Sequence, residues 1–336
     1  MENVIKIDRL CKTFRLQKSA SGMGNALKGL FFPEYIEINA IRDLSLSVNK
    51  GERIAFIGPN GAGKSTAIKM LTGILYPTSG SIEVLGMIPW QERHALGYKI
   101  GTVFGQRSQL WYHLPPADTF DLLSKIYEID KSTYKACLQK LIDLFEIGDL
   151  MQKPVRQLSL GQRMRCEIVA SLLHNPQILF LDEPTIGLDI NAKLNIRSLL
   201  NTLSKEHGIT LFLTSHDTAD IEQVCDRVIV IDKGCIVMDK PLRELKKSYM
   251  RKKIVTIITD EETLQMPVQI PGLKILENTH HHFKCEIDLE TASIKTIIEE
   301  ALSKSTIKDM TIEDPSMEEI IRLVYQSVAS NSNEKL

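Results

Sequence analysis

The chain has 336 residues, of which 43% are hydrophobic and 25% are charged, and its formal net charge is −1. This composition is typical of a globular protein with about two domains, and the charge balance does not require a nucleic acid or an anionic surface as partner. The N-terminus lacks the apolar region of a signal peptide, and no stretch approaches the ~20 apolar residues of a membrane span. Six scattered cysteines without a C-x-x-C pair favour buried thiols in a reducing compartment. We therefore expect a cytosolic chain that acts on a membrane only through a partner.

The first part of the chain alternates between strand and helix patterns. Residues 41–48 carry apolar side chains at an approximate period of two, which indicates a strand with one buried face. Residues 52–58 read ERIAFIG and indicate a strand with a continuous apolar run at 54–57, which is followed by a glycine-rich loop and by helical spacing over residues 65–75. A strand, a tight loop and a helix in this order predict the start of a parallel α/β sheet.

Two segments interrupt this alternation. Residues 15–39 contain a run of small residues and an aromatic pair, Phe31 and Phe32, and we interpret them as an insertion. The insertion is either a surface loop that packs on its own domain or a segment that docks on a partner. Residues from about 107 to 160 space their apolar side chains at three and four, which predicts an inserted helical subdomain.

The composition shifts beyond about residue 245, which limits the first domain to residues 1–245 and predicts a second domain over residues 250–328. The pattern of this second domain indicates a strand, a hairpin, a helix, a strand and a last helix, a small α+β unit of ferredoxin-like type. The three adjacent histidines at 280–282 predict a polar turn, because neighbours in a hairpin cannot all face one metal ion. Residues 329–336 are expected to be a disordered tail.

A phosphate-binding loop is the first motif that carries chemistry. Residues 58–66 match the pattern G-x-x-x-x-G-K-[ST] in full, between a predicted strand and a predicted helix. In this pattern the glycines let backbone N–H groups turn inward and bind phosphate oxygens. Lys64 is expected to reach the β- and γ-phosphates, and the Ser65 hydroxyl is expected to ligate Mg²⁺. The predicted cradle consists of Gly58, Pro59, Asn60, Gly61, Ala62, Gly63, Lys64, Ser65 and Thr66.

A buried strand that ends in two carboxylates is the second motif. Residues 178–183 read ILFLDE, and Asp182 is placed where a carboxylate completes the Mg²⁺ shell, usually through water. Glu183 is then positioned to polarise the water that attacks the γ-phosphate. By itself this segment could be a strand end with solvated acids. Together with the phosphate-binding loop, it predicts a P-loop nucleoside triphosphatase.

Four further motifs narrow the class. Residues 158–162 read LSLGQ, which differs at one position from LSGGQ, the signature of the ABC ATPase family. Gln106 matches the family's Q-loop, residues 184–189 match its D-loop, and His216 matches its switch histidine. In order and spacing, residues 1–240 therefore resemble an ABC ATPase. The resemblance implies a RecA-like P-loop sheet core with an antiparallel β subdomain and an inserted helical subdomain.

The resemblance also implies the roles of individual residues. ATP would be bound between two copies, so that the phosphate-binding loop of one faces Ser159, Gly161 and Gln162 of the other. His216 is expected to contact the γ-phosphate and to hold the attacking water. Gln106 is expected to contact Mg²⁺ or water and to connect the core to the helical subdomain. Catalysis is thus predicted to need Glu183, His216, Gln106 and the loop lysine, with ATP and Mg²⁺ bound.

Simple physics agrees with the dimer that the resemblance implies. Ser159 and the Gly161 N–H lie at a helix N-terminus, which is an anion site, yet this site has no phosphate within its own subunit. Only the γ-phosphate bound to a partner copy can fill it, so hydrolysis is predicted to need a dimer. Leu160 stands where the family has glycine, which leaves the tightness of this turn open.

Three aromatic residues have both a structural and a functional interpretation. Phe14 matches the aromatic residue on which the family stacks adenine, but it could also be an ordinary core phenylalanine. Trp111 and Tyr112 follow the Q-loop, where the family receives the coupling helix of the membrane permease, but they could instead form the core of the helical subdomain.

The motif contexts, together with the predicted C-terminal domain, resemble the ATPases of type-2 ABC exporters of the daunorubicin-resistance kind. This resemblance implies an ATPase that works as a homodimer, or as a heterodimer with a similar ATPase, at the cytoplasmic face of the cell membrane. Its partners would be separately encoded ABC permease subunits, without nucleic acid. The alternative is a non-transport ABC ATPase that acts on nucleic acid or ribosomes, but the chain has neither a long coiled coil between the motifs nor a second cassette. The C-terminal domain is predicted to stabilise the dimer or to regulate it.

Overall fold

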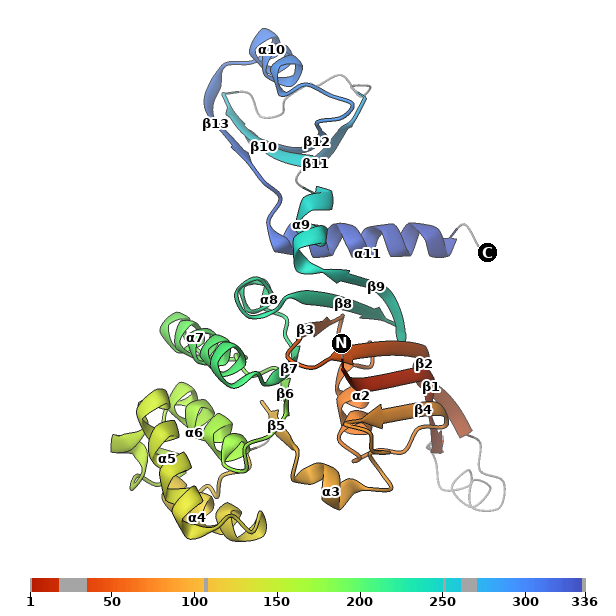
Figure 1. Ribbon diagram of the computed structural model, residues 1–336. Helices are drawn as coiled ribbons and strands as arrows, with labels where there is room; N and C mark the ends of the chain where they lie inside the picture. Colours follow the sequence, from red (N-terminus) through yellow and green to blue (C-terminus); the bar gives the residue numbers. More distant parts are fainter. Residues whose placement is uncertain (1, 18–34, 106–107, 250–251, 261–270, 334–336) are drawn as a thin grey trace, which may run out of the picture. The chain divides into compact units, whose positions relative to one another are not determined.

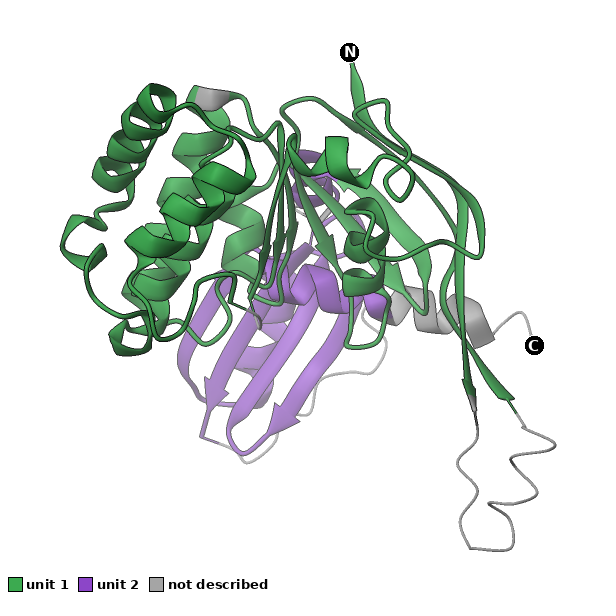
Figure 2. Cartoon of the chain, turned by 90° about the horizontal axis from the view of Figure 1, so that it is seen from below, with its two compact units in different colours: residues 1–240 green, residues 241–336 purple. Residues whose placement is uncertain are grey.

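The computed structural model describes residues 2–17, 35–105, 108–249, 252–260 and 271–333. Contacts between residues divide the chain into two compact units, residues 1–240 and 241–336, which Figure 2 colours separately. The sequence prediction placed this division a few residues later, within what the structure shows to be helix α9 (Leu242–Tyr249). Leu242 and Leu245 of this helix are buried, so the helix is a packed element rather than a linker.

A six-stranded sheet forms the centre of the first unit, in the order β5-β6-β7-β3-β8-β9. The pairs β5–β6, β6–β7, β7–β3 and β3–β8 are parallel, and their residues are buried on both faces, which explains the continuous apolar runs in the sequence. The strands are β3 (Arg53–Ile57), β5 (Ile100–Phe104), β6 (Ile178–Asp182), β7 (Thr210–Thr214), β8 (Arg227–Asp232) and β9 (Cys235–Pro241).

A three-stranded antiparallel sheet, in the order β2-β1-β4, completes the β structure of this unit. Its strands are β1 (Asn3–Gln17), β2 (Tyr35–Asn49) and β4 (Ser79–Val84), and their inward residues share one core with the large sheet. The predicted insertion at 15–39 is partly corrected, because β1 and β2 remain paired out to Gln17 and Tyr35. Cross-strand pairing therefore continues into both ends of that segment, and the aromatic pair of the prediction lies outside the described residues.

The helices of the first unit fall into two groups. Helices α4, α5 and α6 lie together at the β5–β6 end of the large sheet and form the predicted helical subdomain (Figure 1). The remaining helices connect the strands of the two sheets. The elements are α2 (Lys64–Leu71), α3 (Arg93–Gly97), α4 (Pro116–Ile126), α5 (Lys131–Phe145), η1 (Gly148–Leu150), η2 (Val155–Gln157), α6 (Leu160–Leu172), α7 (Ile190–His207) and α8 (Thr218–Val224).

The second unit is a four-stranded antiparallel sheet with helices, as the sequence predicts. Its strand order is β11-β12-β10-β13, and residues of β10 and β12 pack against buried residues of α10. After α9, the elements are β10 (Lys252–Thr259), β11 (Leu273–Thr279), β12 (His282–Asp288), α10 (Ile294–Lys304), β13 (Ile307–Glu313) and α11 (Met317–Asn333).

Two local predictions for this unit have different outcomes. His280 and His281 have φ angles of 38° and 67° and form the two-residue turn between β11 and β12, so the predicted polar turn is confirmed. The predicted tail at 329–336 is partly wrong, because α11 continues to Asn333. The first turns of this helix bury apolar side chains at helical spacing, and helix formation propagates from such an anchored segment. In the part of the chain that the structure describes, no helix is long and apolar enough to span a membrane.

Candidate functional site

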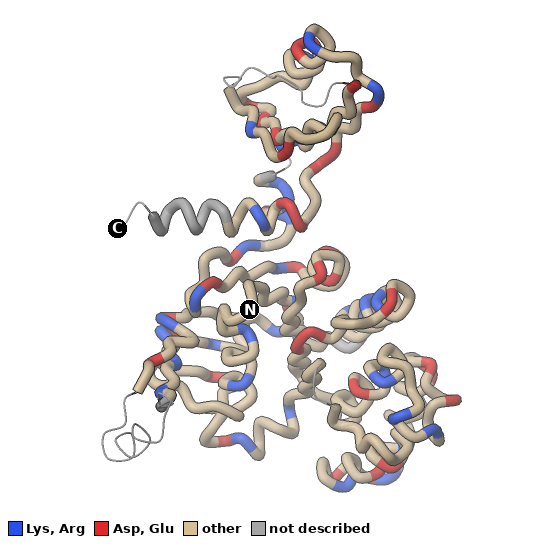
Figure 3. Tube along the Cα trace, turned by 180° about the vertical axis from the view of Figure 1, so that it is seen from behind, with Lys and Arg blue, Asp and Glu red and all other residues tan. Residues whose placement is uncertain are grey.

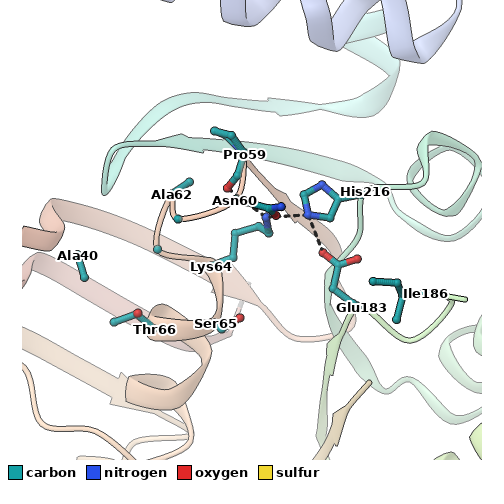
Figure 4. Close-up of a pocket in the computed structure, with 12 residues that line it drawn as sticks. Ala40, Pro59, Asn60, Ala62, Lys64, Ser65, Thr66, Glu183, Ile186 and His216 are labelled. Carbon is teal, nitrogen blue, oxygen red and sulfur yellow. Dashed lines mark hydrogen bonds and ion pairs between the residues drawn. The ribbon is translucent and has the colours of Figure 1, made fainter. Parts of the chain in front are cut away.

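Loops at the carboxyl ends of three neighbouring strands form one pocket. Lys64 follows β3, Glu183 follows β6 and His216 follows β7, and the three side chains point toward one another (Figure 4). The pocket has a volume of about 350 Å³. It is lined by Ala40, Pro59, Asn60, Gly61, Ala62, Gly63, Lys64, Ser65, Thr66, Glu183, Ile186 and His216. The carboxyl edge of a parallel sheet is where α/β proteins bind ligands.

Close packing explains why two positions of the loop carry glycine. A Cβ at Gly58 would lie 2.4 Å from the Ile231 carbonyl oxygen, and one at Gly63 would lie 2.5 Å from the Ala40 oxygen. Gly63 also has a φ of 109°, which residues with a side chain rarely adopt. The loop therefore reaches its shape only with glycine at these positions, and helix α2 begins directly after it. Its first turn presents N–H groups without intrahelical partners, which are suited to bind phosphate.

The Lys64 ammonium lies at the centre of the pocket. Its Nζ donates hydrogen bonds to the Gly58 carbonyl oxygen at 2.6 Å and to that of Pro59 at 3.3 Å. The residue is only 7% exposed, and burial lowers the pKa of its ammonium, while the charges of Glu183 and Asp182 oppose this shift. A buried cation held by weak carbonyl acceptors is suited to receive a more strongly charged ligand such as a phosphate.

Glu183 has an unusual backbone and a buried carboxylate. Its φ is 56°, in the left-handed region, and its N–H donates to the Thr214 carbonyl and hydroxyl oxygens, both at 3.1 Å. Such a conformation in a residue other than glycine is a local strain that often occurs at functional sites. Burial raises the pKa of the carboxyl group, although the neighbouring His216 and Lys64 lower it. Within the described residues, Oε1 is buried, and the polar side-chain atom next to it is His216 Nε2 at 3.2 Å, so Oε1 can accept from a water molecule when the imidazole does not donate to it.

His216 joins the two charged groups. Its Nε2 lies 3.2 Å from the Lys64 Nζ and 3.2 Å from the Glu183 Oε1. A neutral imidazole can accept from the ammonium or donate to the carboxylate at this nitrogen, but it cannot do both at once. The histidine side chain is 47% exposed and faces the pocket, so a ligand can replace either contact.

The residues predicted to hold Mg²⁺ have suitable oxygen atoms. Ser65 lines the pocket with an exposed side chain, and Asp182 ends strand β6 next to the pocket residue Glu183. The Thr214 hydroxyl donates to Asp182 Oδ1 at 2.6 Å and orients the carboxylate. Hydroxyl and carboxylate oxygens are hard ligands that Mg²⁺ prefers, so the donor set fits the ion.

The signature residues lie at the start of helix α6 rather than in this pocket. Ser159 caps the helix by accepting from the Gln162 N–H at 3.2 Å, and the Gln162 side chain accepts from the Ser159 N–H at 2.9 Å. This reciprocal cap leaves the serine O–H and the N–H groups of residues 160 and 161 as donors at the helix N-terminus. None of the residues 159–162 lines the pocket of its own chain.

The substitution of Leu160 for glycine does not disturb this turn. Leu160 is the first residue of α6 and has a negative φ, so the position does not need glycine. Gly161 is different, since a Cβ there would lie 2.7 Å from the Ala192 Cβ in α7. Helix packing therefore requires glycine at position 161, whereas position 160, where the family has glycine, can hold leucine.

The predicted site residue Phe14 lies within the described residues but does not line the pocket. It lies in β1 opposite Ile38, with the Lys12 Nζ 5.1 Å from its ring centroid, and it is half-buried. Ala40 of the adjacent strand does line it. Gln106 lies outside the described residues.

Sequence reasoning missed Thr214, which holds both acidic residues. Its side chain donates to Asp182 and accepts from the Glu183 N–H, and it lies opposite Asp182 in the β6–β7 pair. Its place two residues before His216 was the available signal, but the meaning of that place depends on β6 and β7 being neighbours. Ile186 and Ala40 of the pocket lining were also missed.

The fold and the pocket define a P-loop nucleotide-binding cassette, and comparisons with known proteins specify the family. Residues 41–186 match the family description "ABC transporter", and residues 241–323 match "ATP-binding protein DrrA1-3-like, C-terminal domain". The chain is 32% identical over 211 residues to the ABC transporter ATP-binding protein NatA of Bacillus subtilis, covering 63% of this chain and 85% of that protein. The chain belongs to the ATP-binding proteins of ABC transporters and is an ATPase.

Further relatives and solved structures agree with this assignment. The daunorubicin resistance ATP-binding protein DrrA3 of Streptomyces coeruleorubidus is 28% identical over 289 residues, covering 85% of this chain and 91% of that protein. The bacitracin transport ATP-binding protein BcrA of Bacillus licheniformis is 32% identical over 247 residues, covering 74% and 72%. The structure of cbiO1 from Clostridium perfringens, part of the ABC transporter complex cbiONQ, matches with a TM-score of 0.59 and 25% identity, covering 74% and 94%. The predicted fold and the branch resembling daunorubicin-resistance ATPases are thereby confirmed.

Proposed function

We propose that the protein hydrolyses ATP as a dimer in which the pocket of one copy faces residues 158–162 of the other. The observation that carries this proposal is that the signature turn presents hydrogen-bond donors at a helix N-terminus but does not line the pocket of its own chain. A second copy would bring the missing donors to the γ-phosphate. The likeness to MJ0796, a bacterial ABC transporter cassette with a dimeric structure, supports the arrangement (TM-score 0.58, 25% identity, covering 71% of this chain and 99% of that chain).

In this proposal each pocket residue has a defined task. Lys64 and the N–H groups of the loop bind the β- and γ-phosphates, and Glu183 accepts a proton from the attacking water. His216 holds this water and the γ-phosphate by hydrogen bonds. Phe14 remains the proposed adenine platform, and Gln106 remains a proposed contact to Mg²⁺ or water.

Ser65 and Asp182 would hold the Mg²⁺ ion. When bound, the ion supplies positive charge that neutralises the phosphate oxygens. The contribution of the chain itself is to orient these ligands, since Thr214 holds the Asp182 carboxylate by a hydrogen bond of 2.6 Å.

We further propose that ATP-driven dimer closure acts on separately encoded membrane permease subunits, which hold the protein at the cytoplasmic face of the membrane. Trp111 and Tyr112, in the segment that leads to helix α4, are 50% and 57% exposed, which favours a partner surface over the core of the helical subdomain. Relatives named for bacitracin transport and daunorubicin resistance support export as the direction.

The charge pattern and the C-terminal unit bear on the partners. Among the described residues, basic and acidic positions are interspersed in both units (Figure 3), which supports a transporter ATPase over an ATPase that acts on nucleic acid. The C-terminal unit is a separate candidate for partner contacts, because it has its own buried core. We propose that it stabilises the dimer, formed by two copies or with a similar ATPase, or regulates it.

The Glu183→Gln variant tests the proposed mechanism. We expect hydrolysis to fall by about 10²–10⁴-fold, because the amide cannot accept the proton, while ATP binding persists. With ATP, the variant should then run as a dimer in size-exclusion chromatography with light scattering. The wild type, which hydrolyses its ATP, should return to the oligomeric state that it has without nucleotide. A variant that remains monomeric with ATP, or that hydrolyses ATP normally, would contradict the proposal.

A further inference from the structure

A buried hydrogen-bond network connects the two loops that carry Glu183 and His216. Its centre is Asp220 in helix α8, which is 1% exposed. The Asp220 carboxylate accepts from the Thr185 hydroxyl at 2.5 Å and from the Ser215 hydroxyl at 2.6 Å. Thr185 is two residues after Glu183, and Ser215 is directly before His216. One carboxylate therefore binds both loops.

Helix α7 contributes the positive charge of this network. The Arg197 Nε donates to Asp220 Oδ1 at 2.6 Å, and the same guanidinium lies 2.9 Å from Asp217 Oδ2. The Arg197 side chain is 7% exposed. Asp217 Oδ2 also accepts a hydrogen bond from the Lys193 Nζ at 2.7 Å, and the Asp217 side chain caps helix α8. Burial opposes the charged form of Asp217, but its hydrogen bonds from Lys193 and the α8 backbone and the charge of Arg197 lower the pKa of this carboxyl.

We infer that Asp220 and Arg197 are positioning residues that set the separation between Glu183 and His216. Neither residue lines the pocket, so neither is a catalytic residue. Both oxygens of Asp220 are hydrogen-bonded, and the partners come from three segments that converge only in the folded chain. Such a network has one arrangement in which every member is satisfied, so it restricts the positions of the loops attached to it.

The location of the ion pair argues for a role beyond stability. Buried ion pairs contribute little net stability compared with well-packed apolar residues. The Asp220 member of this pair also joins the loop after β6, through Thr185, to the loop after β7, through Ser215. The side chains that these loops carry meet at 3.2 Å between Glu183 Oε1 and His216 Nε2. A displacement of about 1 Å between reacting groups can lower a rate by about 100-fold. The inference rests on the proposed roles of Glu183 and His216.

The test compares two substitutions at Thr185 in the full-length protein. Thr185→Val conserves the shape of the side chain but removes the hydroxyl that donates a hydrogen bond to Asp220. Thr185→Ser keeps this hydroxyl and removes only the methyl group. We expect Thr185→Val to lower kcat for ATP by about 10–100-fold with little change in KM, since binding groups are untouched. Thr185→Ser should recover most of this loss. Asp220→Asn should lower kcat at least as much as Thr185→Val.

The control is Asp239→Asn, which breaks another carboxylate–guanidinium pair of the same unit. The Asp239 carboxylate accepts two hydrogen bonds from the Arg227 guanidinium, both at 2.6 Å, and neither residue lines the pocket. This variant should lose some thermal stability but keep kcat. If Thr185→Val and Asp220→Asn lower only the melting temperature, as Asp239→Asn does, the inference is wrong. If Asp220→Asn does not fold, the Thr185 pair still decides the question.

A double variant separates this inference from the proposed function. If the network acts through Glu183, adding Thr185→Val to Glu183→Gln should cause no further loss of hydrolysis. A multiplied loss would show that Thr185 acts independently and would overturn the inference. Normal hydrolysis by Glu183→Gln alone would instead refute the proposed role of Glu183.

Discussion

The pocket and the first turn of helix α6 are the two phosphate-directed regions of the first unit, and they differ in completeness. In the pocket, His216 contacts both Lys64 and Glu183, and burial changes the pKa values of those two residues. At the α6 turn, Ser159 is exposed, and among the described residues its side chain bonds only the Gln162 N–H of its own helix. The pocket is thus organised within one chain, whereas the α6 turn presents donors that have no acceptor there. The comparison indicates that the α6 turn is half of a site.

The largest expected effect is on ATP hydrolysis, when the pocket is inactivated in one chain and the α6 turn in another. Lys64→Ala disables the pocket and Ser159→Arg disables the α6 turn, so each variant alone should lose hydrolysis by about 10²–10³-fold. In a mixed dimer, one of the two composite sites has the intact pocket of one chain and the intact turn of the other. Mixing the two inactive variants should therefore restore ATP hydrolysis, measured as phosphate release.

A matched control uses another exposed serine that caps a helix. Ser293 caps α10 in the second unit by accepting from the Lys295 N–H. Ser293→Arg should leave hydrolysis unchanged, which separates the loss of a cap from the loss of a phosphate ligand. Full activity of Ser159→Arg alone would show that one chain suffices, and the comparison between the two regions would then be wrong.

The ionisation of Glu183 gives an intermediate effect confined to the pocket. Burial raises the pKa of this carboxyl above its ordinary value of about 4.3, against the opposing charges of His216 and Lys64. As the pH falls through the raised pKa, the carboxylate gains a proton and can no longer act as a base. A carboxyl-carbon NMR titration of the free protein, with Glu183→Gln to assign the signal, should show this. A signal that titrates at the ordinary value would refute the expectation.

The smallest expected effect concerns the cap of helix α6. Gln162→Ala removes the side-chain oxygen that accepts from the Ser159 N–H at 2.9 Å. We expect the free energy of unfolding to fall by about 0.5–1 kcal/mol, measured by urea denaturation, because one exposed hydrogen bond is lost. No change would mean that the reciprocal cap does not stabilise this turn, and a loss of several kcal/mol would mean that Gln162 supports more than its own helix.

The sequence alone determined the local chemistry of this protein. The loop at 58–66, the acidic strand end at 182–183 and the start of α6 are short segments whose glycines, apolar runs and capping residues specify their own conformation. The second unit was likewise predicted as a small α+β domain from its periodicity. Leu160 was the exception, since the sequence left the turn open and the structure shows an ordinary helical residue.

The tertiary structure alone decided which residues outside these motifs support them. Strand order is not encoded in local periodicity, so the pairing of β6 with β7, which places Thr214 beside Asp182 and Glu183, could not be read from the chain. The same holds for Asp220, an ordinary acidic residue in the sequence that becomes a buried junction only when α7 and α8 pack together. Local sequence specifies a group and its conformation, whereas contacts between segments distant in the chain arise from the packing of the whole core.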